Sequence, residues 1–174
     1  MERKTAGFTL IESAVTVSVM SILVVLAFRP FVAFLEQQRA AATMASLVSQ
    51  MSHARLAAVK HRHPTVLCPS VDGLQCLLGG DWSGGWMMFV DRDNLRRPSL
   101  PADVLQVELS PGTPHLRVYS STGRSHLRYL PDGRSAGANL TINVCTLQGM
   151  RVGAVIVNNA GRPRTERGQG GACP

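Results

Sequence analysis

The chain ends on a stretch, NNAGRPRTERGQGGACP, whose arginines are suited to binding an anion. Arg162 and Arg164 are separated by a single proline, and in an extended chain such side chains point the same way, about 6.6 Å apart. Guanidinium groups donate forked hydrogen bonds to phosphate oxygens. Gly161 permits a tight turn before them, and Arg167 follows shortly after. We therefore expect a projecting loop whose Arg162, Arg164 and Arg167 contact the phosphate backbone of a nucleic acid.

The charge of the whole chain agrees with an anionic partner. Lys and Arg together number 18 against 11 Asp and Glu, which gives a formal net charge of +7. Sixteen of these 18 basic residues are Arg. Such a balance favours nucleic acid, an acidic membrane surface or an acidic protein as partner, and a plain solubility charge is the alternative. Further arginines extend the footprint if they share a face with the C-terminal loop: Arg124, Arg128, Arg134 and Arg151.

No arrangement of residues in the sequence points to catalysis. The chain has no G-x-S-x-G, H-E-x-x-H or phosphate-loop motif. The segment DRDN at 91–94 is spaced like the start of a calcium loop, but Ala102 stands where such a loop has its glutamate. Trp82, Trp86 and Phe89 have side chains that can stack on bases, although we expect Trp86 and Phe89 in the core. We therefore expect neither an enzyme nor a bound metal or cofactor.

Four cysteines allow three disulfide connectivities. We expect Cys68–Cys76, which closes a short loop, and Cys145–Cys173, which ties the C-terminal loop to an earlier strand. The second bond would hold the arginines on the domain, so that less conformational entropy is lost on binding. A zinc site made of two histidines and two cysteines is the alternative, and the absence of C-x-x-C spacing speaks against it.

The N-terminal part contains one apolar segment long enough to cross a bilayer. Residues 8–28, FTLIESAVTVSVMSILVVLAF, carry a single charge, Glu12, and about 20 apolar residues span the hydrocarbon core as a helix. Arg3 and Lys4 precede this segment, which by the positive-inside rule places the N-terminus in the cytoplasm and the rest outside the inner membrane. Because a carboxylate in a membrane helix is costly, Glu12 is expected to have a function.

The remaining pattern predicts an α+β fold. Apolar residues recur every three or four positions over 44–58, which is helical spacing. After Pro64, short runs rich in β-branched and aromatic residues alternate with turn signals. We therefore expect a long N-terminal helix with a membrane-spanning segment (8–28) and an amphipathic continuation (29–63). The second part packs on an antiparallel β-rich head (64–174).

Residues 4–12, KTAGFTLIE, resemble the class III signal of type IV prepilins and type II secretion pseudopilins. The resemblance implies that residues 1–7 are a leader, that a prepilin peptidase cuts between Gly7 and Phe8, and that the amine of Phe8 is then methylated. It also implies that Glu12 pairs with the N-terminal amine of a neighbouring subunit, which is the partner that a buried charge needs. The protein would be a single-pass protein of the bacterial inner membrane with a periplasmic head, and would enter a filament with other pilins.

Four segments of the expected head narrow this resemblance: CPSVDGLQC, DWSGGWMMFVDRDN, YLPDGRSAGANLTINVC and VIVNNAGRPR. Together they are similar to the minor pilins of the FimT/GspH family, whose C-terminal G-R-x-R motif is associated with DNA capture in natural transformation. Gly161, Arg162 and Arg164 match that motif. The resemblance implies a type IV pilin-like fold and a minor pilin that binds double-stranded DNA non-specifically. The alternative is a structural minor pseudopilin of a type II secretion system, or a pilus-assembly subunit, without DNA binding.

Overall fold

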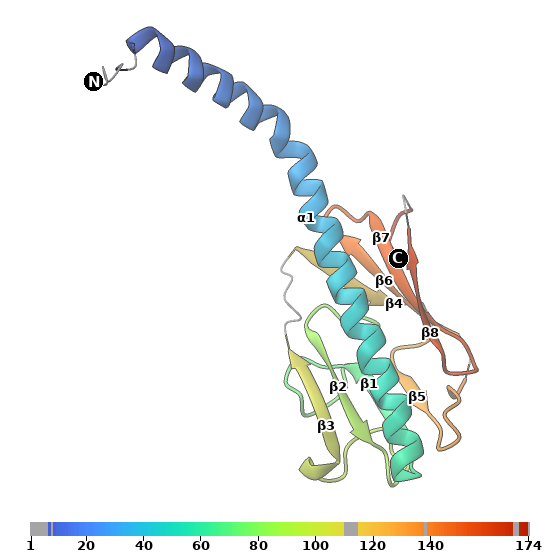
Figure 1. The fold of residues 1–174 in the computed structure, drawn as a ribbon. Helices are drawn as coiled ribbons and strands as arrows, with labels where there is room; N and C mark the ends of the chain where they lie inside the picture. Colours follow the sequence, from blue (N-terminus) through green and yellow to red (C-terminus); the bar gives the residue numbers. More distant parts are fainter. Residues whose placement is uncertain (1–6, 8, 110–114, 138, 169–170, 174) are drawn as a thin grey trace, which may run out of the picture. The chain divides into compact units, whose positions relative to one another are not determined.

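The computed structural model describes residues 7, 9–109, 115–137, 139–168 and 171–173. It divides into two compact units, Met1–Leu35 and Glu36–Pro174. One helix, α1 (Leu10–His61), contributes to both units and continues past Pro30 (Figure 1). Within the part of the chain that the structure describes, α1 is the one helix long and apolar enough to cross a membrane.

The first unit presents an apolar helical surface. Its large hydrophobic side chains are exposed, from Leu10 to Phe34. The N-terminus of α1 is capped by Thr9, whose Oγ1 accepts a hydrogen bond of 3.3 Å from the Glu12 N–H. Glu12 lies in the first turn, where the helix dipole favours a carboxylate. An apolar surface of this extent is typical of a segment covered by lipid or by other helices.

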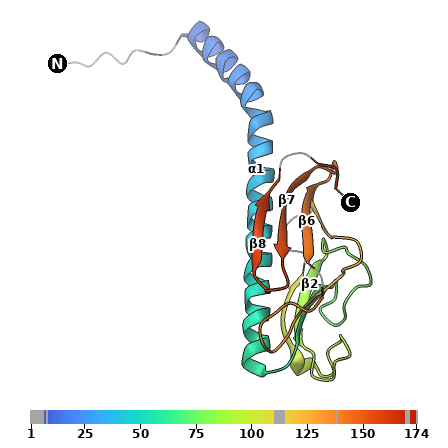
Figure 2. The same cartoon turned by 90° about the vertical axis from the view of Figure 1, so that its right-hand side faces the viewer.

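The second unit combines the C-terminal part of α1 with two four-stranded antiparallel sheets. The sheets have the orders β3-β2-β1-β5 and β4-β6-β7-β8, and Figure 2 shows β6, β7 and β8 side by side. A short 3-10 helix, η1 (Pro101–Asp103), precedes β3. The α+β architecture expected from the sequence is confirmed. The strands are β1 (Thr65–Pro69), β2 (Gly85–Val90), β3 (Val104–Leu109), β4 (Leu116–Ser120), β5 (Leu127–Tyr129), β6 (Leu140–Thr146), β7 (Arg151–Val157) and β8 (Pro163–Arg167).

One stripe of α1 holds the two sheets together. Its members are buried and join residues of both sheets in a single cluster, Trp86 from β2 and Ile142 from β6 among them. Burying one large apolar side chain contributes about 1.5–3 kcal/mol, so the shared core is the main source of stability in the second unit. The stripe consists of Ala40, Met44, Leu47, Met51, Ala54 and Ala58.

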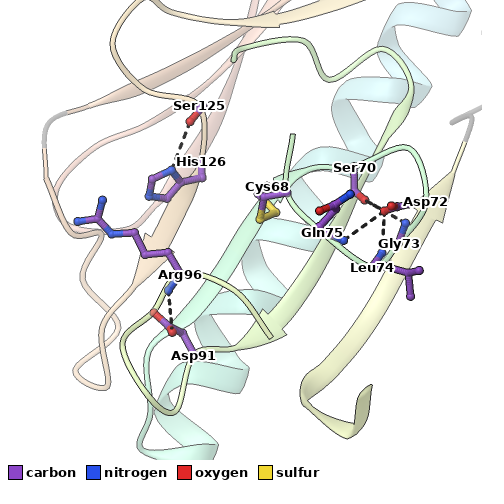
Figure 3. Close-up of a disulfide and its surroundings, with 11 residues drawn as sticks. Cys68, Ser70, Asp72, Gly73, Leu74, Gln75, Asp91, Arg96, Ser125 and His126 are labelled. Carbon is purple, nitrogen blue, oxygen red and sulfur yellow. Dashed lines mark hydrogen bonds between the residues drawn. A yellow bond between two sulfur atoms is a disulfide. The ribbon is translucent and has the colours of Figure 1, made fainter. Parts of the chain in front are cut away.

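Strand β2 is buried on both faces, which accounts for its unbroken apolar sequence GWMMFV. Trp86 faces the shared core. Phe89 belongs to a second, smaller cluster together with Cys68, and Cys76 packs against it. The loop that the Cys68–Cys76 disulfide closes therefore covers the side of this sheet that α1 does not (Figure 3).

The Asp72 carboxylate organises that loop. Its Oδ1 accepts hydrogen bonds from the N–H groups of Leu74 (2.8 Å) and Gln75 (3.2 Å) and from the Ser70 hydroxyl (3.1 Å), as Figure 3 shows. The two backbone hydrogen bonds hold the pKa of Asp72 below its ordinary value. This stabilisation is therefore present above the usual carboxyl pKa of about 3.9. It is lost as the pH falls through the lower pKa of the folded state.

Two disulfides join Cys68 to Cys76 and Cys145 to Cys173, the pairs favoured from the sequence. Their Cα atoms lie 5.6 and 6.3 Å apart. The second bond links residues 28 positions apart. It fastens the chain beyond β8 to strand β6. The C-terminal segment is therefore held by pairing with β7 along β8 and by the disulfide beyond β8.

We expect the double variant Cys145→Ala/Cys173→Ala to lower the free energy of unfolding by about 3–4 kcal/mol, because the unfolded chain regains the entropy of the open loop. Thermal unfolding followed by tryptophan fluorescence measures this. The chain has 2 tryptophans, and both are buried in the second unit, so the signal reports that unit. A variant as stable as the oxidised parent would contradict the expectation.

Candidate nucleic-acid interface

Arg164 and Arg167 lie on a strand, β8, rather than on a projecting loop, and Arg162 directly precedes that strand. Strand β8 pairs antiparallel with β7 along its whole length. The turn before it is closed by a hydrogen bond of 2.9 Å from the Gly161 N–H to the Asn158 carbonyl. The expected loop was therefore wrong, because β7 offers this segment partners for its backbone groups. Pro163 is compatible with β8 because a proline is tolerated as the first residue of a strand.

Gly161 is buried, and its backbone positions the arginines that follow it. Its φ is +74°, a conformation that favours glycine. A Cβ atom here would lie 2.4 Å from the Gly133 carbonyl oxygen and 3.0 Å from the Tyr129 ring. Because the glycine of the G-R-x-R motif has no side chain, the turn packs directly against the segment after β5. This packing fixes the position of Arg162.

The three predicted arginines of the tail do not share one face. Arg164 is exposed and lies opposite Ile156 of β7, whereas Arg167 lies opposite Gly153. A Cβ on Gly153 would meet the Met44 side chain of α1 at 2.6 Å, so that face of the sheet points toward the helix. Arg167 accordingly lines a hollow beside α1. Side chains alternate along a strand, so Arg164 points to the opposite side, called here the outer face.

Arg151 also reaches the outer face, but Glu166 partly neutralises it. The register between β6 and β7 shifts after Val144, so that Val152 has no partner on β6 and the alternation changes phase. Arg151 Nη2 then lies 3.7 Å from Glu166 Oε1. Among the described residues, Arg162, Arg164 and Arg167 are exposed and form no ion pair. Of these three, Arg164 lies on the outer face and Arg162 directly precedes its strand.

Arg117 on β4 is a further cation of the outer face that was not among the residues expected from the sequence. It alternates with the buried Leu116 and Val118, and its Nη1 donates a hydrogen bond of 3.2 Å to the Tyr119 hydroxyl. The alternating pattern of HLRVY was the available signal. Arg134, which was considered as an extension, is exposed and paired with Asp132 at 2.6 Å.

The structure removes two other candidates from the interface. Trp82, Trp86 and Phe89 are fully buried, so none of them can stack on a base. Asp91, the first residue of DRDN, is also buried and accepts a hydrogen bond of 3.1 Å from the Arg96 N–H. Among the described residues no group of three His, Cys, Asp or Glu side chains could hold a metal ion.

The expected processing site falls at the start of the described chain. Gly7 is exposed and precedes α1, and Glu12 lies in the first helical turn. Phe8 and the leader residues 1–6 lie outside the described residues. The cleavage and methylation expected there stay predictions.

Two family models match the sequence. The model of the type II transport protein GspH matches residues 43–161, and the model of the prokaryotic N-terminal methylation motif matches residues 3–28. The chain belongs to the GspH family. Its members are minor pilins and pseudopilins, which are structural subunits of filaments and not enzymes. The GspH match ends at Gly161, so Arg162 and Arg164 lie beyond it. No curated protein matches the sequence.

Solved structures of minor pilins share the fold of this GspH-family chain. The type IV minor pilin FimU of Pseudomonas aeruginosa matches with a TM-score of 0.58 and 19% identity, over 81% of this chain and 98% of FimU. A second crystal form of FimU matches with a TM-score of 0.54 and 19% identity, over 73% of this chain and 95% of FimU. The minor pseudopilin EpsH from the Type 2 Secretion System of Vibrio cholerae matches with a TM-score of 0.52 and 11% identity, over 74% of this chain and 97% of EpsH. The fold is therefore that of a type IV pilin.

We expect Gly161→Ala to lower the free energy of unfolding by about 1–3 kcal/mol, because alanine is strained at this φ and its Cβ collides with the Gly133 carbonyl. Gly123→Ala is the matched control. Gly123 also has a positive φ, +87°, but nothing lies within 4 Å of its Cβ position, so this variant should lose only about 1 kcal/mol. Chemical denaturation of both variants measures the difference. Equal losses would show that the contact between the turn and Gly133 does not constrain the fold.

Proposed function

We propose that this minor pilin binds double-stranded DNA non-specifically through Arg162 and Arg164 and serves DNA uptake in natural transformation. One observation carries the proposal. Two exposed guanidinium groups without an ion pair among the described residues follow a buried turn glycine, Arg164 on the outer face of a strand and Arg162 directly before it. The strand is hydrogen-bonded to β7, and the chain beyond it is fastened by the Cys145–Cys173 disulfide.

The chemistry of this surface supports a duplex backbone as the ligand. Arginine donates to phosphate oxygens in a forked geometry, and phosphate contacts position a protein on DNA without reading its sequence. Binding to single strands relies on exposed aromatic side chains that stack on bases. Both tryptophans and Phe89 are buried, so none of these three can provide such stacking.

The affinity of one subunit is expected to be weak. Two phosphate contacts release few counterions, and each contributes only about 0.9 to the salt dependence of binding. Glu166 adds a negative charge to the outer face and engages Arg151. Because β8 is already ordered, little conformational entropy is lost on binding. Several copies near each other in a filament would raise the effective affinity through avidity.

We further propose that the chain is processed and assembled as a pilin. A prepilin peptidase removes residues 1–7 by cutting between Gly7 and Phe8, and the amine of Phe8 is methylated. Glu12 then pairs with the N-terminal amine of a neighbouring subunit. Support comes from the methylation motif at residues 3–28 and from the apolar helix that follows Gly7. In this proposal the head faces the periplasm and the segment 8–28 lies in the inner membrane before assembly.

Intact mass spectrometry of the chain isolated from its own cells should find the mass of residues 8–174 plus one methyl group. Gly7→Leu should keep the leader, because the peptidase recognises the residue before the cut. Glu12→Gln should be cut and methylated like the parent but remain in the membrane fraction instead of entering filaments, because the amine then has no carboxylate to pair with. A parent chain that retains residues 1–7 would refute the processing proposal.

We expect Arg162→Gln/Arg164→Gln to weaken binding to a random-sequence duplex and to make the salt dependence shallower. Because the double variant cannot neutralise two of the phosphates, the log–log slope should fall by about 1.8, so the parent's advantage shrinks by about tenfold between about 50 and about 200 mM salt. The measurement is a fluorescence anisotropy titration of the mature full-length chain in neutral detergent.

Arg62→Gln/Arg167→Gln is the matched control for that titration. It removes the same charge, but Arg167 faces α1 and Arg62 lies directly after that helix, so binding should stay within about twofold of the parent. Equal losses in the two double variants would mean a diffuse attraction and refute the assignment to β8. A parent that does not bind DNA would leave the structural role, in a type II secretion pseudopilus or in pilus assembly.

A further inference from the structure

A second group of arginines surrounds the half-buried imidazole of His126. Arg124 precedes β5 and Arg128 lies within it, whereas Arg96 comes from the loop after β2. Burial lowers the pKa of His126, and the nearby charges of Arg96, Arg124 and Arg128 lower it further. Asp91 is the carboxylate that acts in the opposite direction. Figure 3 shows Arg96, Asp91 and His126 in this region. We call Arg96, Arg124 and Arg128 the His126 arginine cluster.

Asp91 offsets one charge of this cluster and is already engaged. One oxygen accepts the Arg96 N–H at 3.1 Å (Figure 3), and the other lies 3.4 Å from Arg128 Nε. Arg128 also donates to the Asn94 side chain. Asn94 and Arg96 have φ values of 59° and 57°, which are costly for residues with a side chain. The interactions of Asp91 and Asn94 hold the loop in the conformation that places Arg96 near His126. One carboxylate against three arginines leaves the cluster with a net positive charge.

Arg124 has an unsatisfied hydrogen-bond donor, which indicates that the cluster binds an anion. Its Nη2 donates to the Ala136 carbonyl at 2.5 Å and to the Ser135 hydroxyl at 3.4 Å. Its Nη1 is buried without a hydrogen-bond partner in the protein, although buried donors are almost always satisfied. Among the described residues, the Arg96 side chain also forms no hydrogen bond or ion pair. A tetrahedral oxyanion can accept from both guanidinium groups at once.

The cluster is connected to the C-terminal arginines through Ser135. This residue accepts a hydrogen bond from Arg124, and its N–H donates to the Asn159 carbonyl at 3.1 Å, in the turn that precedes Arg162. These hydrogen bonds fix the position of the cluster relative to the turn that precedes Arg162. Ser135 and Asn159 also line a hollow in the surface of the head, together with Gly137.

We propose that the His126 arginine cluster is a second phosphate site, which takes a phosphodiester group of the same duplex that Arg162 and Arg164 hold. This inference rests on the proposed function, since it assigns the cluster to the same ligand. The ligand class follows from the donors: guanidinium groups from two separate chain segments lie around one imidazole. The site extends the DNA footprint from β8 across the turn to β5.

Occupancy of this site changes the protonation of His126. A phosphate among the guanidinium groups cancels part of the positive field at the ring, so the pKa of His126 rises on binding. By linkage, binding tightens as the pH falls through that pKa, because the imidazolium adds a positive charge at the site. The charged groups that face the ring are the three arginines and Asp91.

The test uses NMR of the mature full-length chain in neutral detergent micelles. The pKa of His126 is followed through its ring proton, assigned with His126→Gln, in the free protein, with inorganic phosphate and with a short duplex. We expect the duplex to raise this pKa by about half a unit to one unit. Arg96→Gln should reduce that rise and make the salt dependence of duplex binding shallower by about 0.9. Its exposed neighbour Arg97 supplies the matched control, Arg97→Gln, which should behave like the parent.

The outcomes separate this inference from the function on which it rests. If the duplex leaves the pKa of His126 unchanged and Arg96→Gln binds like the parent, the second site is refuted, whatever the Arg162/Arg164 variant does. If Arg96→Gln weakens binding while Arg162→Gln/Arg164→Gln does not, the assignment to β8 fails and the cluster stands. A rise with inorganic phosphate, but not with the duplex, would overturn DNA as the occupant.

Discussion

The packing of one helical stripe against two sheets is the constraint on which the rest of the head depends. In the described part of the chain the two sheets share no strand and no ladder of hydrogen bonds. Residues of α1 such as Leu47 and Met51, which are fully buried in the common cluster, join them. Each sheet packs one of its faces on the helix. Alternate side chains of each strand therefore point toward the helix, and the others point away from it. In the second sheet this leaves a solvent-facing side on which long cationic side chains can stand.

Backbone pairing, more than residue type, decides which arginines can act together. Arg164 and Arg167 are three residues apart on the same strand and both are exposed, yet Arg164 points to the outer face and Arg167 to the side of α1. A register shift of one residue has the opposite effect on Arg151, because it brings this side chain to the side where Glu166 stands. The resulting surface carries a small number of separated positive charges. This arrangement suits a ligand whose negative charges are regularly spaced along a chain.

The sequence was sufficient for the elements that local pattern determines. The helix, the β-rich character of the chain after Pro64, and the burial of Trp86 and Phe89 follow from helical spacing and from short runs of β-branched and aromatic residues. Strand β8 was missed because Gly161 and Pro163 are strong turn signals, and because its stability comes from an edge that only the folded β7 provides. The surroundings of His126 were also beyond reach, since they depend on a contact between two loops distant in the sequence. Residue charges can be read from a sequence, but which of them share a face depends on register.

Strand β8 is the last strand of its sheet, and an edge strand can pair with the edge of another molecule. Proteins prevent such pairing with proline and with charged side chains on the edge, and β8 has both in PRTER. When heads are crowded together in a filament, like charges on this edge would oppose joining of sheets between neighbours. The same arginines would then keep adjacent heads as separate folding units, which links the charge of this segment to solubility as well as to ligand binding.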